Sequence, residues 1–164
     1  MTEIKRIMVA LEFSESTPEL FKFAAEFAAK MGTGLIAVNV IDSRDVDAIS
    51  RIASMGYEID GSRYVKEIIT ERKKLLDSMI KGSSMKPDQV REIFQVGRPA
   101  NELLKVAVKE QVDIIIMGLK AHTEFEHFFV GSVAEKLFRR SPFTIVSYRH
   151  KTHAGRLKKR IRLN

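Results

Sequence analysis

The sequence predicts an α/β protein with a single doubly wound domain, and three observations support that class. Short, apolar, β-branched segments recur along the chain, as expected of strands buried on both faces of a parallel sheet. Amphipathic segments of helical period separate them, so strands and helices alternate as far as residue 148. The length of 164 residues fits one domain. We expect a five-stranded, mostly parallel sheet in the order 3-2-1-4-5, with helices on both faces.

The first strand, helix and strand form the clearest unit. IKRIMVAL, residues 4–11, predicts the first strand, and GLIAVNVI, residues 34–41, predicts the second. Between them, Thr17 is suited to an N-cap, Pro18 to a first helical turn and Gly32 to a helix end. A helix between two apolar strands requires the strands to be parallel.

The rest of the chain continues this alternation. Val46 and Ile49 predict a short helix that Gly56 interrupts. The later elements are expected as a helix over residues 59–80, a strand over 90–96, a helix from Pro99, a strand over 112–117, a helix over 132–139 and a strand over 143–148.

Composition limits the class of protein. The chain is 45% hydrophobic and 30% charged, which is ordinary for a soluble globular domain. No apolar run approaches the roughly 20 residues of a membrane span, and the N-terminus does not have the pattern of a signal peptide. Because cysteine is absent, disulfide and thiolate–metal chemistry are excluded, and we expect a cytoplasmic protein.

The net charge of +7 lies entirely in the C-terminal tail, because residues 1–148 contain equal numbers of acidic and basic side chains. The domain itself therefore lacks the basic face of a duplex-binding protein. We expect residues 1–149 to form the domain and residues 150–164 a disordered basic tail. Leu157, Ile161 and Leu163 lie between the basic residues. The sequence therefore also allows a short amphipathic helix in the tail, which would contact an anionic membrane, a nucleic acid or an acidic partner.

Several strand ends are expected to meet a helix start at the carboxyl edge of the sheet, where ligands bind in such folds. The first strand leads to Glu12 and the fourth to Gly118, and Gly131 with Ser132 begins the next helix. The N-terminus of a helix attracts anions, and a glycine lets an anion approach the backbone. From the spacing alone, a structural interpretation has equal weight: Gly118 as a tight turn and Ser132 as a helix cap.

The segment from Gly118 to Ser132 resembles the nucleotide motif G-x2-G-x9-G-[S/T] of the universal stress protein family, with Ala121 at the second glycine. The blocks ALEFSES, VNVID, VGRPANELLKVAVKEQVDIIIMG and GSVAEKLFRRSPFTIVSY are also similar, so the resemblance covers residues 4–149. It implies a Rossmann-like fold that binds ATP or a related adenine nucleotide as a regulatory ligand in a stress response. It also implies a homodimer formed through the last strand, between Phe143 and Tyr148.

Carried over position by position, the resemblance implies a nucleotide site at Ala10, Glu12, Val40, Met117, Gly118, Ala121, Gly131, Ser132 and Val133. Adenine would lie against Val40 and Met117, and the ribose would approach Glu12 and Gly118. The phosphates would lie against Ala121, Gly131, Ser132 and Val133. We expect Mg²⁺ to accompany the nucleotide, although the sequence nominates no protein ligand for it.

Two positions depart from the family pattern. Glu12 replaces the usual aspartate and places its carboxylate one methylene farther from the backbone. Ala121 replaces a glycine, and an alanine forced into a left-handed conformation costs about 1 kcal/mol, which weakens a site before abolishing it.

The alternative is a dimeric scaffold that has lost nucleotide binding. The substitution Ala121→Gly distinguishes a weakened site from a lost one. If the site is lost, the glycine creates tight binding where none existed, and if the alanine is tolerated, the affinity barely changes.

The same segment contains histidine, glutamate and phenylalanine residues: His122, Glu124, Phe125, Glu126, His127, Phe128 and Phe129. The spacing of the two histidines fits no i,i+4 helical pair, so a metal site is weakly indicated, and the phenylalanines favour packing onto the sheet or a partner. The sequence has neither a Walker GK[ST] motif nor a nucleophile elbow. We therefore expect a binding protein with at most slow ATP hydrolysis or autophosphorylation, and not a dedicated enzyme.

Overall fold

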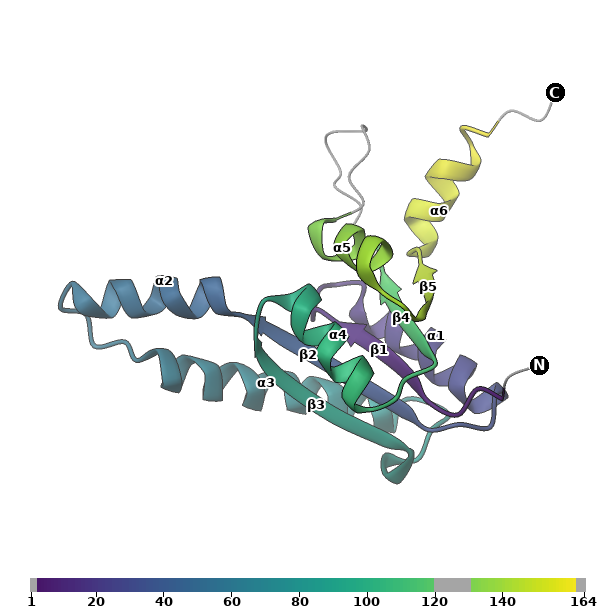
Figure 1. Cartoon of the computed structure of the whole chain (residues 1–164), viewed down its shortest axis with the longest axis horizontal. Coiled ribbons are helices and arrows are strands. Elements are labelled where there is room, and N and C mark those ends of the chain that lie inside the picture. Colours follow the sequence, from purple (N-terminus) through teal and green to yellow (C-terminus); the bar gives the residue numbers. More distant parts are fainter. Residues whose placement is uncertain (1–2, 120–130, 162–164) are drawn as a thin grey trace.

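The computed structural model describes residues 3–119 and 131–161, which form one five-stranded sheet in the order β3-β2-β1-β4-β5 (Figure 1). All four strand pairings are parallel. The strands are β1 (Ile7–Leu11), β2 (Leu35–Asp42), β3 (Val90–Gly97), β4 (Ile114–Gly118) and β5 (Thr144–Tyr148). The predicted fold class and strand order are confirmed.

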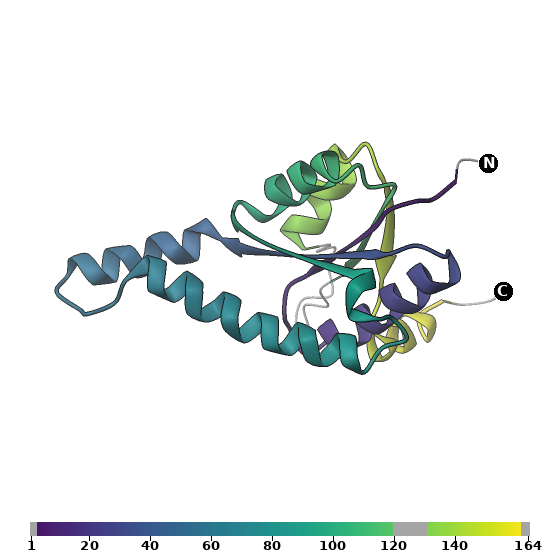
Figure 2. The ribbon, with the colours of Figure 1, turned by 90° about the horizontal axis from the view of Figure 1, so that it is seen from below.

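Helices cover both faces of the sheet (Figure 2). They are α1 (Thr17–Lys30), α2 (Ser43–Ser54), α3 (Gly61–Lys81), α4 (Pro99–Lys109), α5 (Ser132–Arg140) and α6 (Lys151–Lys158), with a 3₁₀ helix η1 (Pro87–Gln89). In β1, Ile7 and Val9 pack with α1 and α3, whereas Met8 packs with α4 and α5. Because neighbouring residues of a strand point to opposite faces, a strand covered on both sides is apolar throughout.

The loop from β1 to α1 differs from the sequence-based expectation by one residue. The N-cap of α1 is Ser16, and Thr17 is the first helical residue, with 2% of its surface exposed. The Thr17 hydroxyl accepts a hydrogen bond from the Ser14 amide at 2.8 Å. The prediction of Thr17 as N-cap is therefore wrong, because this side chain orders the preceding loop instead. That loop includes Phe13, whose φ of 55° is in the left-handed region.

Helix α2 and the beginning of α3 form a helical hairpin that projects from the body of the protein (Figures 1 and 2). Asp42 caps α2 by accepting a hydrogen bond from the Arg44 amide at 3.0 Å. The two helices approach closely at Gly61, where a Cβ atom would lie 2.8 Å from Ser50 Oγ. Gly56 follows α2 with a φ of 94°, as expected of the interruption predicted there.

The C-terminal tail contains helix α6, the kind of short helix that the sequence leaves open beside a disordered tail. His150 is its N-cap, and His150 Nε2 lies 2.6 Å from Glu19 Oε2 of α1. The Tyr148 hydroxyl donates a hydrogen bond to the other carboxylate oxygen of Glu19 at 2.5 Å. These contacts hold the start of the tail against α1. Across residues 3–119 and 131–161, no helix is long and apolar enough to span a bilayer.

Candidate functional site

A cavity of about 480 Å³ opens at the carboxyl end of the sheet, within the size range of small-molecule sites. It brings together every described residue of the predicted nucleotide site: Ala10, Glu12, Val40, Met117, Gly118, Gly131, Ser132 and Val133. Ala121 lies outside the described residues, as do His122 and His127. Residues far apart in the sequence therefore line one cavity, as expected from the position of the strand ends at one edge of a parallel sheet.

Three apolar residues form one wall of this cavity. Ala10 of β1 is paired with Met117 of β4 in the sheet register, and Val40 lies on the adjacent strand β2. All three side chains belong to the face of the sheet that packs with α4 and α5. Met117 is buried, whereas Ala10 and Val40 are half-buried. This wall is an apolar surface on which a flat aromatic ring can rest.

Gly118 ends β4 at the edge of the cavity. Its φ is not positive, and the Leu119 amide that follows donates a hydrogen bond to the Tyr148 carbonyl at 3.0 Å. A Cβ atom at Gly118 would lie 3.5 Å from Leu20 Cδ2, an ordinary van der Waals distance. Gly118 therefore has the backbone of a strand end, and its own conformation does not require glycine. Neither the backbone conformation nor the packing of the described residues excludes a side chain here.

The N-terminus of α5 lies at the same cavity. Its N-cap is Gly131, with φ −42° and ψ 149°, and no side chain caps the helix. The first backbone bond of the helix runs from the Glu135 amide to the Gly131 carbonyl at 3.0 Å. Ser132 is the first helical residue, so its interpretation as the helix cap is wrong. The first-turn amides carry a partial positive charge and suit an anion.

Two carboxylates line the cavity at the ends of β1 and β2. Glu12 Oε1 accepts a hydrogen bond from the Ser14 hydroxyl at 3.1 Å. Asp42 forms an ion pair with Arg44 at 2.5 Å, and this hydrogen-bonded guanidinium lowers the pKa of Asp42 below its ordinary value. Asp42 is thus held as an anion in its ion pair with Arg44, and the Glu12 side chain also lines the cavity.

Helix α3 adds a wall that the sequence analysis missed, formed by Tyr64, Ile68 and Arg72. Arg72 Nη1 donates a hydrogen bond to Asn39 Oδ1 at 2.8 Å, and Asn39 Nδ2 donates one to the Leu11 carbonyl at 2.7 Å. Two sequence signals mark these positions. Asn39 is a polar residue within the apolar strand GLIAVNVI, and Arg72 lies at helical spacing between Ile68 and Leu76.

The described residues provide no evident metal site of their own. In the parts of the chain that the structure describes, no three His, Asp or Glu side chains are grouped so that they could hold an ion. A cation that accompanies a ligand here would therefore depend on the oxygen atoms of that ligand.

A family model described as the universal stress protein family matches residues 3–149. The universal stress protein MJ0577 of Methanocaldococcus jannaschii is 26% identical over 145 residues, covering 84% of this chain and 90% of its own length. The putative universal stress protein SSP1056 of Staphylococcus saprophyticus is 27% identical over 155 residues, with 91% and 86% coverage.

Solved structures show the same fold. The structure of MJ0577 superposes with a TM-score of 0.71 at 25% identity, covering 92% of this chain and 99% of its own. A universal stress protein in complex with cAMP superposes with a TM-score of 0.63 at 16% identity, with 90% and 98% coverage. The Archaeoglobus fulgidus universal stress protein in complex with dAMP gives 0.61 at 20% identity, with 89% and 98% coverage. This chain therefore belongs to the universal stress protein family.

Proposed function

We propose that this protein binds ATP or a related adenine nucleotide as a regulatory ligand in a stress response. One observation carries the proposal: the glycine end of β4, the N-terminus of α5 and an apolar wall face the same cavity. The proposed site is formed by the residues predicted from the sequence, namely Ala10, Glu12, Val40, Met117, Gly118, Ala121, Gly131, Ser132 and Val133.

The chemistry of each part of the cavity supports this ligand class. The apolar wall of Val40 and Met117 suits the adenine ring. Glu12 is a hydrogen-bond acceptor suited to the ribose hydroxyls, and the amides of the first turn of α5 suit the phosphates. We propose that Mg²⁺ binds together with the nucleotide through the phosphate oxygens.

Two solved structures with this fold support the proposal that the ligand is an adenine nucleotide. One is a complex with cAMP and the other is a complex with dAMP. Both ligands carry an adenine base and a phosphate on the sugar. A regulatory role with at most slow hydrolysis accords with the lack of a Walker GK[ST] motif. We also propose a cytoplasmic location and a homodimer that forms through β5.

The direct test is to denature the purified protein and to identify the small molecules in the supernatant by chromatography. Adenine nucleotide in the extract, and a saturable heat of binding when ATP is titrated into the emptied protein, are the expected results. An empty extract together with no heat at millimolar ATP would reject the proposal. That result would favour the alternative of a nucleotide-independent dimeric scaffold.

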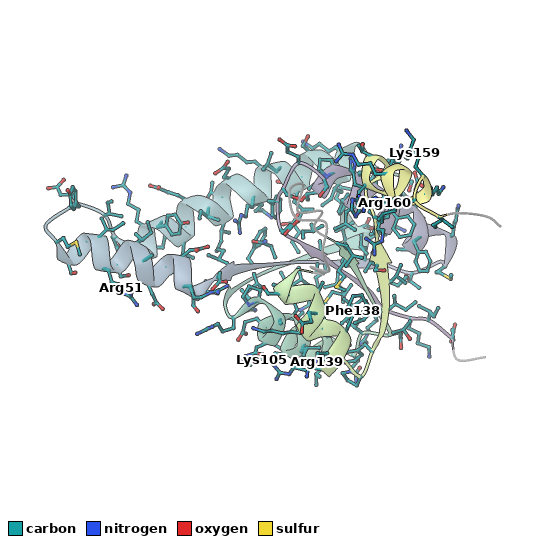
Figure 3. The ribbon with its side chains drawn as sticks, turned by 90° about the horizontal axis from the view of Figure 1, so that it is seen from above. Arg51, Lys105, Phe138, Arg139, Lys159 and Arg160 are labelled. Atoms are coloured by element: carbon teal, nitrogen blue, oxygen red, sulfur yellow. The ribbon has the colours of Figure 1, made fainter. Side chains whose placement is uncertain are left out.

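Helix α6 favours a second candidate role, attachment of the protein to an anionic partner. The tail carries the whole net charge, and basic residues including Lys159 and Arg160 lie on α6 and at its end (Figure 3). Polybasic segments bind anionic membranes and nucleic acids by releasing counterions. Cosedimentation with anionic vesicles, with and without residues 150–164, tests this role: equal pelleting of both forms excludes a membrane-binding tail.

A further inference from the structure

A positive charge interrupts the apolar stripe of α3 at the point where the stripe passes the end of the sheet. Tyr64, Ile68, Arg72, Leu76 and Ile80 recur every four residues and so lie along one side of the helix. Leu76 and Ile80 are buried in the core, with 1% and 4% of their surface exposed. The other three line the cavity, and Arg72 is half-buried there.

The guanidinium of Arg72 is held in place by neutral groups. Its hydrogen-bond acceptor, Asn39, is 3% exposed and is itself bonded to the main chain of β1. The guanidinium carbon lies 5.6 Å from the centroid of the Phe13 ring, a cation–π contact. These contacts fix the position of the charge without neutralising it.

No ion pair formed within residues 3–119 and 131–161 includes Arg72. The next residue, Lys73, shows the contrast, because its amine lies 2.6 Å from Glu92 Oε2. A half-buried cation without an acidic partner among the described residues has lost solvation there without the compensation that an opposite charge provides. An anion bound in the cavity would supply that charge.

The two anchors of Arg72 place it beside the proposed ribose site. Asn39 is bonded to Leu11, and the Phe13 ring faces the guanidinium, so the anchored residues flank Glu12 on both sides. In dinucleotide-binding folds, an acidic residue at a strand end binds free ribose hydroxyls, whereas in sites for a phosphorylated ribose a nearby arginine accommodates the phosphate. This cavity contains both kinds of group, so Glu12 can bind the ribose hydroxyl that stays free while Arg72 binds the phosphate.

We propose that Arg72 binds a phosphate carried by the ribose of the nucleotide, so that the preferred ligand is an adenine nucleotide phosphorylated on its 2′ or 3′ hydroxyl as well as at the 5′ position. The inference rests on the proposed function, because it requires an adenine nucleotide in the cavity. The planar guanidinium forms paired hydrogen bonds with phosphate oxygens.

The test compares AMP with adenosine 2′,5′-bisphosphate and adenosine 3′,5′-bisphosphate by titration calorimetry on the full chain. We expect at least one bisphosphate to bind about tenfold more tightly than AMP. Arg72→Met should abolish this preference, whereas Arg72→Lys should keep only part of it, because the charge stays and the paired donors are lost. Lys73→Met removes a charge from the neighbouring position and should preserve the preference.

Several outcomes would overturn the inference. Equal binding of AMP and both bisphosphates by the wild-type chain excludes a ribose-phosphate site while leaving the proposed function intact. A preference of wild-type size in Arg72→Met or in Arg72→Lys, with only the unfolding midpoint lowered, would show that Arg72 only stabilises the β1–α1 loop. If Arg72→Met does not fold, the test compares the ratio of bisphosphate affinity to AMP affinity in Arg72→Lys with the same ratio in the wild-type chain. A ratio that is equal in the two proteins would overturn the inference. Failure of the wild-type chain to bind any of the nucleotides rejects the proposed function itself.

Discussion

Gly118 is a residue at which a substitution is expected to affect ligand binding and to leave folding nearly unchanged. Its conformation and surroundings accept a methyl group, since the nearest contact of a Cβ atom is Leu20 at 3.5 Å. The same methyl group would lie at the cavity, where we propose that the nucleotide contacts the backbone. A glycine that the described packing does not require is therefore best explained by the ligand.

We expect Gly118→Ala to change the free energy of unfolding by less than about 0.5 kcal/mol. We expect the same variant to weaken ATP binding by about tenfold or more, because the methyl group holds the ligand away from the main chain. Urea unfolding and calorimetry on one preparation measure both quantities. Gly82→Ala, at the end of α3 with φ −84°, is the matched control, and an unchanged ATP affinity in Gly118→Ala would contradict the proposed contact.

Tyr148 and Glu19 join the last strand to the first helix. Burial, and then the hydrogen bond to Glu19, raise the pKa of Tyr148 to about 12, so the hydroxyl stays protonated at neutral pH. The same hydrogen bond lowers the pKa of Glu19 below its ordinary value, with a further contribution from His150. The charged form of Glu19 is therefore the form that this contact stabilises.

Tyr148→Phe should lower the free energy of unfolding by about 1 kcal/mol at neutral pH. Because the pKa of Glu19 is lower in the folded protein, its contribution is complete above the unfolded-state pKa and is lost as the pH falls through the folded-state value. Denaturant unfolding of both proteins from neutral to acidic pH should show the difference shrinking in acid. Tyr57→Phe, on the exposed turn of the hairpin, is the control. A difference that is independent of pH would contradict this account.

Strand β5 is the element through which we propose that a second copy of the chain binds. It pairs with β4 on one side and forms an edge of the sheet, and its Thr144 and Ser147 side chains are exposed. An unpaired edge favours association with another strand. In a two-fold dimer each residue of the interface occurs twice, so a single introduced charge brings two like charges together.

We expect the wild-type chain to be a dimer by light scattering after size exclusion, and Ser147→Glu to shift it towards the monomer. Ser54→Glu adds the same charge at the far end of α2 and should leave the dimer intact. A wild-type monomer, or a Ser147→Glu variant with the wild-type mass, would contradict a dimer formed through β5.

The helices and strands were predictable where residues close in the sequence determine them. They were less predictable where contacts with residues far away in the sequence determine where an element begins. Every strand was predicted, and β1, β2 and β4 gave the clearest signal, because both faces of the sheet are covered there and their apolar runs are nearly continuous. The first strand was expected from Ile4 but begins at Ile7, since the amides of Lys5 and Arg6 bond to the Asp113 carboxylate at 2.8 and 2.9 Å. Helix α6 was only one of two possibilities that the sequence left open for the tail, because Glu19, which holds the start of the helix, lies far away in the sequence.

Across the whole molecule, the position of the site followed from topology. Parallel strands place their carboxyl ends at one edge of the sheet, so the sequence predicts that Glu12, Val40 and Gly118 lie close together. The wall from α3 was not predicted, because nothing in the sequence indicates how far the helical hairpin reaches over that edge. Arg72 and Asn39 meet across 33 positions of the chain, a contact that periodicity does not reveal.

The central claim, that one adenine nucleotide binds the folded chain at this cavity, is tested most directly by thermal unfolding with and without ATP. A ligand at 100 times its Kd adds about 2.7 kcal/mol of stability, which raises the midpoint of a domain of this size by roughly 5–10 °C. We expect ATP to produce this rise and inorganic triphosphate, which lacks the adenosine, to produce much less. An unchanged midpoint at saturating ATP, or an equal rise with inorganic triphosphate, would contradict the claim.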